Sequence, residues 1–359
     1  MSERTLRVAA LLAAATASAC ADAPSAVAPA PLAETAVSAT YTVQALPIPA
    51  SALYGEASSI NDAGFIAGWY SDGNTWSAVA WNPAGTQSLP LGTLPMFQSS
   101  TAKGINASGS VVGYVVSSGF ARSKAFIWTR AGGMRALPDL GGTGSIGLAI
   151  NDAGLAVGIS GTPNGATHAA EWLPNGTIVD LNPAGAGASE ARAVNRVGDI
   201  VGVAVIPPAA EHAYLWRHDG VQVDLGTLGG TRSWANGVND ALQIVGVSDR
   251  PFPLAPIAFG WTQSLGMRAL AKMGPNSEAL GVSNLARAVG KQTITAGVVG
   301  MAVFQASLDV LPDLAPAKGF PFSAATFVNT CGTAVGSSVS PNPTSGNSVP
   351  VVWRKAVCD

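Results

Sequence analysis

The stretch INDAG, an Asn-Asp pair beside a glycine, stands at residues 60–64 and again at 150–154. These residue types could form a metal-binding loop, supply a catalytic acid, or make a turn. In an alignment of all similar stretches, the aspartate position holds Asp62, Ala107, Asp152, Arg196, Asp240, Leu285 and Thr330. The aspartate is optional, so it is not a ligand or acid that every copy needs. Asn in first place with Gly in fourth is typical of a type I turn, and we interpret the stretch as the corner of a hairpin.

The other groups that could do chemistry are sparse. The three histidines are His168, His212 and His218. The first two occupy the same place in adjacent repeats, where other copies have Ser77, Lys124, Ile257, Gly300 and Val349, so a repeated structural position is favoured over a metal pair. The 21 acidic residues are scattered without a repeated pair. The pattern predicts no Ser-His-Asp arrangement, no carboxylate pair and no metal site, and hence a protein that is not an enzyme.

Two further motifs resemble known binding loops. GTGSIG at 142–147 matches the spacing of a dinucleotide-binding loop, but such a loop must open a helix and this one leads into a strand signal. SDGNTW at 71–76 resembles the Asp-box of some propellers, yet its Asp and Gly are adjacent, whereas the Asp-box separates them by one residue. We interpret both motifs as loops and predict no cofactor.

Repeats place these residues in a larger pattern. Three anchors recur about every 45 residues: an asparagine, a glycine after an apolar pair, and an aromatic residue. The asparagines are Asn61, Asn106, Asn151, Asn195, Asn239, Asn284 and Asn329. The glycines are Gly68, Gly113, Gly158, Gly202, Gly246, Gly290 and Gly336. The aromatic residues are Trp81, Trp128, Trp172, Trp216, Trp261, Phe304 and Trp353.

Each unit contains four short strand signals separated by Gly, Asn, Pro and Asp, and none shows a helical period. Four antiparallel strands every ~45 residues is the spacing of a β-propeller blade. The fold predicted is therefore all-β, a single β-propeller domain over residues 41–359 with seven four-stranded blades. The second and fourth residues before the Asn are mostly small, which favours an innermost first strand. The aromatic anchors are expected to fill the space between blades rather than bind sugars.

The two ends of the repeat region complement each other. Residues 41–47 (YTVQALP) match the fourth strand of a unit, while the chain ends on a third strand. The N-terminal strand is therefore predicted to close the last blade and remove an open edge. Cys331 lies in a turn and Cys358 just after the final strand, at one end of that blade, so a disulfide between them is expected in an exported protein.

The first residues have the features of an export signal. Arg4 and Arg7 precede the apolar run 8–19, which is too short to span a bilayer. The run ends in ASAC, which is similar to a lipobox, so residues 1–19 are interpreted as a lipoprotein-type signal peptide with Cys20 lipidated. Plain secretion after cleavage at Ala19 is the alternative. Residues 20–40 are rich in Ala and Pro and are interpreted as a tether between membrane and propeller.

The units resemble a known family. HAYLW at 212–216, VDLGTLGGTRSWANGVND at 223–240 and QIVG at 243–246 are similar to the HAF-repeat family of bacterial extracellular repeat proteins. The resemblance covers about residues 53–353 and is clearest in the first five units. It implies an exported repeat protein of propeller type. It implies no established activity.

Composition argues against nucleic-acid binding, and the variable loops suggest ligand contacts. Net charge is −2 with only 11% charged residues, so no basic stripe supports nucleic-acid binding. The loops after the second and fourth strands of a blade share one face, the loop face. Five residues there are predicted ligand contacts: Tyr70, Trp76, Arg122, Arg232 and Arg250.

We therefore expect a monomeric, lipid-anchored cell-envelope protein of the outer membrane, periplasm or cell surface. It would act as a non-catalytic binding or scaffold protein for a protein or glycan ligand, touching the membrane only through the anchor. The alternative is a secreted carbohydrate-active or other hydrolytic enzyme with its site on the loop face. A lectin-like module with one sugar site per blade is disfavoured because the loops differ between copies.

Overall fold

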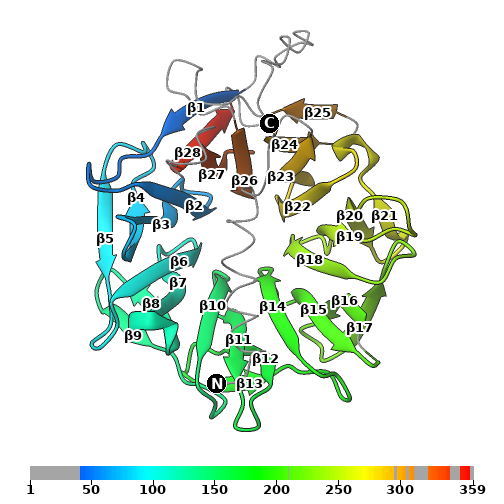
Figure 1. The fold of residues 1–359 in the computed structure, drawn as a ribbon, viewed down its shortest axis with the longest axis horizontal. Coiled ribbons are helices and arrows are strands. Elements are labelled where there is room, and N and C mark those ends of the chain that lie inside the picture. The colour runs from blue at the N-terminus through cyan, green and yellow to red at the C-terminus, as the bar shows by residue number, and fades with distance from the viewer. Residues whose placement is uncertain are drawn as a thin grey trace.

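The computed structural model describes residues 41–208, 210–294, 297–304, 307–310, 322–339 and 348–355. Within these ranges the strands form seven four-stranded antiparallel sheets arranged around a centre (Figure 1). We call each sheet a blade. The described residues also contain two three-residue 3-10 helices, η1 (Ser118–Phe120) and η2 (Ala271–Met273). None of their helices is long and apolar enough to cross a membrane.

The first four blades follow one another along the chain. Blade 1 contains β2 (Tyr54–Ile60), β3 (Ile66–Ser71), β4 (Trp76–Trp81) and β5 (Ser88–Gly92). Blade 2 contains β6 (Ser99–Ile105), β7 (Val111–Val116), β8 (Ser123–Thr129) and β9 (Gly133–Ala136). Blade 3 contains β10 (Ser145–Ile150), β11 (Ala156–Gly161), β12 (Thr167–Trp172) and β13 (Ile178–Asp180). Blade 4 contains β14 (Ser189–Val194), β15 (Ile200–Ile206), β16 (Ala210–Trp216) and β17 (Gln222–Gly226).

The remaining blades complete the ring. Blade 5 contains β18 (Ser233–Val238), β19 (Ile244–Ser248), β20 (Ile257–Thr262) and β21 (Gly266–Ala269). Blade 6 contains β22 (Ser277–Val282), β23 (Arg287–Ile294), β24 (Gly297–Phe304) and β25 (Ser307–Val310). Blade 7 contains β26 (Phe322–Val328), β27 (Ala334–Val339), β28 (Ser348–Lys355) and, from the other end of the chain, β1 (Tyr41–Ala45). The first strand of each unit lies nearest the centre (Figure 1).

The N-terminal strand closes blade 7, as predicted. β1 pairs antiparallel with β28, with Tyr41 opposite Lys355 and Ala45 opposite Val351. Cys331 lies in the turn between β26 and β27 and is disulfide-bonded. Cys358, its predicted partner, and Cys20 lie outside the described residues, so the pairing with Cys358 stays a prediction.

The core consists of separate hydrophobic clusters between neighbouring blades. Trp81 of blade 1 is 1% exposed and packs with Val335 and Val352 of blade 7. Trp172 of blade 3 packs with Val112 of blade 2. Their indole N–H groups donate to backbone carbonyls of the linkers that enter their blades. These aromatic side chains thus have the structural role expected of them.

The recurring glycine in the second strand of each blade is explained by a β-bulge in the neighbouring inner strand. Each first strand has a β-bulge opposite the glycine, for example between Ala57 and Ser59 in blade 1 and between Gly147 and Ala149 in blade 3. A Cβ added to any of these glycines would lie 1.9–2.1 Å from a carbonyl oxygen of the inner strand; they are Gly68, Gly113, Gly158, Gly202, Gly246, Gly290 and Gly336. The bulge leaves room only for a hydrogen at this position.

Blade 6 requires a correction to the predicted register. The backbone N–H of Ser283, not Asn284, donates to the residue four places on, as the asparagines do in the other turns. In that register, Ala286 takes the left-handed position, with φ of 60°, that Gly64 takes in blade 1. Gly290 pairs with Met301 as Gly68 pairs with Val79, so Val303 and not Phe304 corresponds to Trp81. Asn284 and Phe304 therefore stand one residue away from the anchor positions, which the register gives to Ser283 and Val303.

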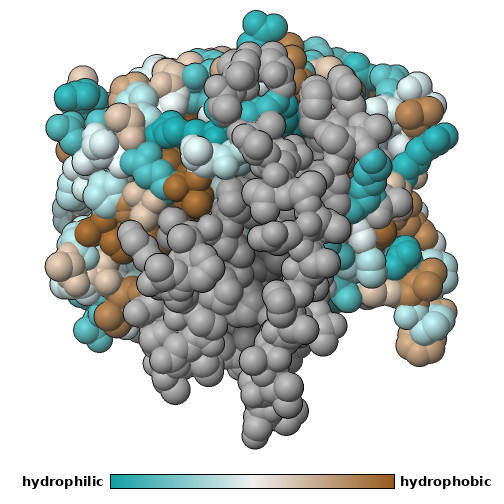
Figure 2. Space-filling view, turned by 90° about the horizontal axis from the view of Figure 1, so that it is seen from above, coloured by the Kyte–Doolittle hydropathy of each residue, from teal (hydrophilic) through white to brown (hydrophobic). Residues whose placement is uncertain are grey.

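The outer surface is mixed in character. On the side shown in Figure 2, hydrophobic residues form small groups among hydrophilic ones in the described part of the chain. Apolar residues of this kind are normal on the surfaces of folded proteins.

Candidate functional site

The asparagines of the repeated turn link the blades to one another. In six blades the Asn side-chain N–H₂ donates to the backbone carbonyl of the equivalent residue in the next blade, at 2.9–3.3 Å. The bonds run from Asn61, Asn106, Asn151, Asn195, Asn239 and Asn329. The Oδ1 atom of each accepts a backbone N–H within its own turn, as Leu155 donates to Asn151 at 3.0 Å. All six are buried, so these side chains hold the ring together and are not free for a ligand.

The optional aspartate makes a second link between blades. The Asp152 carboxylate accepts the backbone N–H of Ala107 at 2.7 Å, and Asp62 accepts that of Thr330 at 2.8 Å. Asn284 takes this role in blade 6 by accepting the N–H of Asp240 at 3.0 Å. Asn284, which the repeat alignment assigned to the asparagine position, therefore occupies the aspartate position in the structure.

Between blades 6 and 7 the asparagine bond is missing, and another contact takes its place. The Ser283 side chain is too short to span to the next turn. Arg287 is only 2% exposed, and its Nη1 donates to the carbonyl of Cys331 at 3.4 Å. Its guanidinium lies against Gly332, where a Cβ would be 1.6 Å from Nη1. The long side chain of Arg287, at the other end of the same turn, thus supplies the link that Ser283 lacks.

Replacing Asn151 with alanine is expected to destabilise the fold by about 2 kcal/mol, because it removes two hydrogen bonds: one to the Asn195 carbonyl and one from the partly buried Leu155 N–H. Thermal or urea unfolding measures the change. Asn175→Ala, at an exposed hairpin turn of the same blade, is the matched control and should cost well under half as much. Equal effects of the two substitutions would contradict a structural role for the ring.

Two histidines form equivalent pairs with aspartates. The Nδ1 atoms of His168 and His212 lie 2.8 Å from the carboxylates of Asp180 and Asp224, in blades 3 and 4. Lys124 occupies the same place in blade 2 and pairs with Asp139. A cation can replace the imidazole, which supports the interpretation of this position as structural. No group of three or more His, Cys, Asp or Glu among the described residues is placed to hold a metal ion.

Asp199 and His218 form a third pair on the turn face, opposite the loop face. Burial raises the pKa of the Asp199 carboxyl, but hydrogen bonds from the His218 side chain and backbone N–H and from Asn195 outweigh it. The net result is a pKa below the ordinary value of 3.8. The His218 Nδ1 lies 2.7 Å from Asp199 Oδ1. The ionised carboxylate therefore stabilises the folded state.

Asp199 is expected to contribute to acid sensitivity. A folded-state pKa below the unfolded one gives stability that is present above about pH 4 and is lost as pH falls through the folded pKa. Asp199→Asn should be less stable than the parent at pH 7, and the difference should shrink as pH falls below about 4. Thermal melts of both proteins from pH 7 to pH 2.5 measure this. A difference that does not change with pH would argue against it.

The inner strands carry a polar network that sequence analysis did not identify. Arg192 lies 3.1 Å from Glu190 and donates to Asn236 at 2.7 Å. Asn236 donates to Glu278, which lies 3.4 Å from Lys291. The network joins blades 4, 5 and 6. The signal in the sequence is a glutamate one residue before the small residue of the inner strand, and it is weak because it recurs in only three units.

These glutamates do not form a catalytic pair. Glu56, Glu190 and Glu278 belong to blades 1, 4 and 6, which are not adjacent, and each lies within 4 Å of a lysine or arginine. Retaining or inverting glycosidases need two carboxyl groups on either side of one bond. The arrangement of these three carboxylates favours a structural role.

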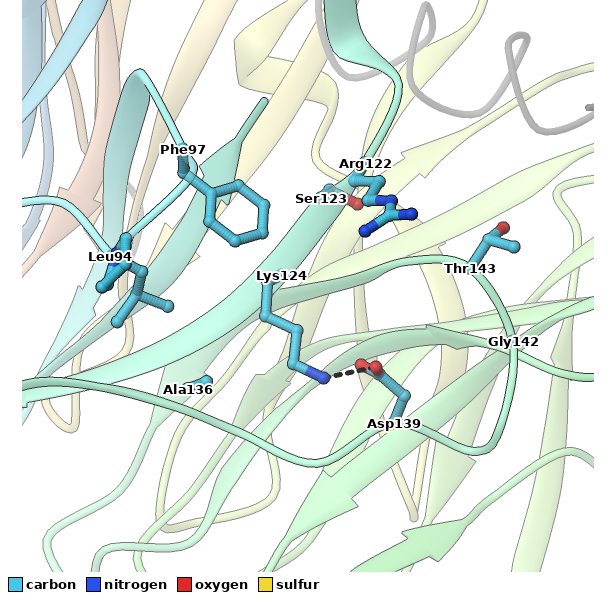
Figure 3. A pocket seen from close by; sticks show the side chains of 10 residues that line it. Leu94, Phe97, Arg122, Ser123, Lys124, Ala136, Asp139, Gly142 and Thr143 are labelled. Carbon is cyan, nitrogen blue, oxygen red and sulfur yellow. Dashed lines mark hydrogen bonds and ion pairs between the residues drawn. The ribbon is translucent and has the colours of Figure 1, made fainter. Parts of the chain in front are cut away.

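A cleft opens on the loop face between the linkers that enter blades 2 and 3 (Figure 3). Its volume is about 550 Å³, within the usual range for small-ligand sites. Ten residues line it: Leu94, Pro95, Phe97, Arg122, Ser123, Lys124, Ala136, Asp139, Gly142 and Thr143. The Asp139 carboxylate accepts bonds from both Lys124 and the Ser145 hydroxyl. The predicted contact Arg122 is the only one of the five to line this cleft.

An aromatic pair involves the loop that carries the cleft residue Arg122. The rings of Trp76, from blade 1, and Phe120, from the loop of blade 2 that carries Arg122, meet edge to face with centroids 5.2 Å apart. Phe120 is 57% exposed although large and apolar. Trp76 and Arg122 are therefore the two predicted contacts that the fold places in one region, and Phe120 is a neighbour that sequence analysis missed.

The other three predicted contacts pack against, pair with or bond to groups outside the cleft. Tyr70 packs against the hydrophobic cluster between blades 7 and 1. Arg232 pairs with Asp249 at 3.0 Å and lies over the ring of Trp234. Arg250 donates to the Ala255 carbonyl at 2.7 Å and so closes its own loop. Single-residue reasoning cannot find such partners, because loop conformation decides them.

No protein-family model matches the chain, and no curated protein matches it in sequence. Solved structures are similar in fold. The β-propeller domain of the Trilobed protease from Pyrococcus furiosus, described as having an open velcro topology, has a TM-score of 0.56 and 7% identity, over 85% of this chain and 98% of that one. The lectin BP39L from Burkholderia pseudomallei has a TM-score of 0.51 and 10% identity, over 85% and 96%.

A puromycin hydrolase in complex with PGG is also similar, with a TM-score of 0.54 and 14% identity over 82% of this chain. The chain spans about half of the hydrolase, 53% of its length. At these identities the similarities show the β-propeller fold alone. Proteins with and without enzymatic names share it, so the fold does not choose between catalysis and binding.

Proposed function

We propose that this propeller is a non-catalytic binding or scaffold protein of the cell envelope that holds its ligand on the loop face. The observation that carries the proposal is the ring pair between Trp76 and Phe120, the latter on the loop that also carries the cleft residue Arg122. It joins loops of two blades in one place. Partly exposed aromatic residues next to arginine are the composition of binding hot spots.

The ion pairs of the inner-strand glutamates support a binding function rather than catalysis. The inner-strand glutamates each have a cationic neighbour. A catalytic base must instead be free to reach a proton of the substrate. The rival proposal of a hydrolase on the loop face would need a group on that face that moves protons.

Arrays of immobilised glycans and peptides, probed with the purified full chain, test the proposal, with mass spectrometry of bound material to detect products. We expect binding without product. Trp76→Ala and Phe120→Ala should each weaken it at least tenfold, as truncating a central aromatic contact does. Phe65→Ala, at an exposed aromatic residue in a turn on the opposite face, is the matched control. Product formation would support the hydrolase instead.

We also propose that the protein is exported and anchored through Cys20, as a member of the HAF-repeat family. The sequence features before residue 40 and the repeat resemblance support this, and the former lie outside what the structure describes. Cys20→Ser is expected to move the protein from the membrane fraction to the soluble exported fraction and to abolish incorporation of labelled fatty acid. An unchanged distribution would contradict lipidation and leave plain secretion.

A further inference from the structure

The cleft on the loop face has an apolar side and a polar side. Figure 3 shows Leu94 and Phe97 along one side and Arg122 and Thr143 toward the other. Leu94 and Phe97 come from the linker between blades 1 and 2. Thr143 comes from the linker between blades 2 and 3, and Arg122 from a loop of blade 2. A ligand that fills the cleft must therefore combine an apolar part with a polar part.

Arg122 determines the charge of the polar part. Lys124 and Asp139 neutralise each other between the two sides (Figure 3), and Asp139 also accepts the Ser145 hydroxyl. The guanidinium of Arg122 has no hydrogen bond or ion pair with another described residue, and the residue is exposed. The cleft thus presents one uncompensated positive charge. A guanidinium fork binds a carboxylate through two parallel hydrogen bonds.

Two residues at the cleft have unusual backbones and exposed apolar side chains. Met96 has a φ of 71° and is 83% exposed, and Phe120 has a φ of 57° and is 57% exposed. Left-handed conformations are uncommon for large side chains. Met96 lies in the linker between the cleft residues Pro95 and Phe97. Both residues thus present large apolar side chains to solvent on the two segments that carry the cleft residues Phe97 and Arg122.

We propose that this cleft binds the C-terminus of a peptide, with the free α-carboxylate on Arg122 and an apolar last side chain against Leu94 and Phe97. The inference rests on the proposed binding function and names the ligand class. In a C-terminal residue an anion and an apolar side chain are joined to the same carbon. A neutral sugar is disfavoured because it offers no anion to the guanidinium of Arg122.

The experiment uses a fluorescein-labelled pentapeptide, Ser-Gly-Ser-Leu-Phe, with either a free or an amidated C-terminus. Fluorescence anisotropy with the full chain measures both affinities. We expect the free acid to bind at least tenfold more tightly than the amide. Arg122→Gln should abolish that preference. The control is Arg130→Gln, which removes an exposed arginine at the hairpin turn between β8 and β9, on the opposite face, and should leave the preference unchanged.

Three results would overturn the proposal: no binding of the free acid, equal binding of acid and amide, or an acid preference that survives in Arg122→Gln. The array experiment separates this failure from that of the proposed function. A ligand whose binding depends on Trp76 and Phe120 but not on Arg122 would keep the binding function and remove the carboxylate site. If a neutral glycan bound in a way that depends on Trp76 and Phe120 but not on Arg122, the ligand would be a glycan and not a peptide C-terminus.

Discussion

Gly158→Ala is expected to destabilise the propeller by roughly 3 kcal/mol, the upper end of what overpacking a tight interior costs. The new Cβ would lie 2.0 Å from the carbonyl oxygen of Ile146 and 3.1 Å from the Cα of Gly147. Both are backbone atoms of β10 at its bulge, so no side-chain rotation can relieve the contact. The inner strand would have to move, and with it the turn that holds Asn151.

The matched control for this substitution is Gly187→Ala in the linker before β14. Its nearest heavy atom would be Val205 Cγ1 at 3.9 Å, an ordinary van der Waals contact. We expect this variant to unfold within about 0.5 kcal/mol of the parent, as substitutions without a specific clash do. Urea unfolding of both proteins measures the difference. If Gly158→Ala were as stable as Gly187→Ala, the bulge would not be the reason for the recurring glycine.

Deletion of β1, Tyr41–Ala45, is expected to lower stability by on the order of 5 kcal/mol and to leave blade 7 open. Each net hydrogen bond contributes roughly 1 kcal/mol, and burying an aromatic side chain about 2 kcal/mol. β1 pairs with β28 over five residues, and Tyr41 belongs to the cluster of Trp353 and Val351. Gln44 also donates to the carbonyls of Ala84 and Gly85 in blade 1.

Calorimetry of the deletion variant tests this, with removal of residues 30–34 as a control of equal length. The control should melt like the parent. A synthetic peptide of residues 41–48 added to the deletion variant should restore part of the lost stability, because the docking is non-covalent. A deletion variant that melts at the parent temperature would show that β1 does not close the ring.

The repeating positions could be predicted because each is demanded by local geometry. Asn61 and Gly64 make a tight corner, and Gly68 faces a bulged strand, so the same residue types return wherever the same geometry returns. Sequence reasoning failed in blade 6. There Ser283 and Val303 occupy the anchor positions, while Asn284 and Phe304 stand one residue away and imitate them. Pairing between strands, not residue type, determines the register.

The candidate site was predicted only in part. Trp76 and Arg122 were identified because aromatic and arginine residues in variable loops suit binding. Their neighbour Phe120 was not, and Tyr70, Arg232 and Arg250 have partners that loop sequence does not reveal. Which loop side chains stay free depends on contacts between blades and on loop conformation, and neither has a periodic signal.

The sequence by itself determined the unit of this protein: four strands, a corner built on Asn and Gly, an aromatic residue for the space between blades, and a spare first strand. These are local or periodic properties, fixed by backbone sterics and by which face of a strand is buried. Only the tertiary structure decided what INDAG does. Its Asn and Asp bond to the neighbouring blade, about 45 residues away or, across the closure, 268 residues away. Such bonds depend on how the blades are placed around the centre, and no single unit contains that information.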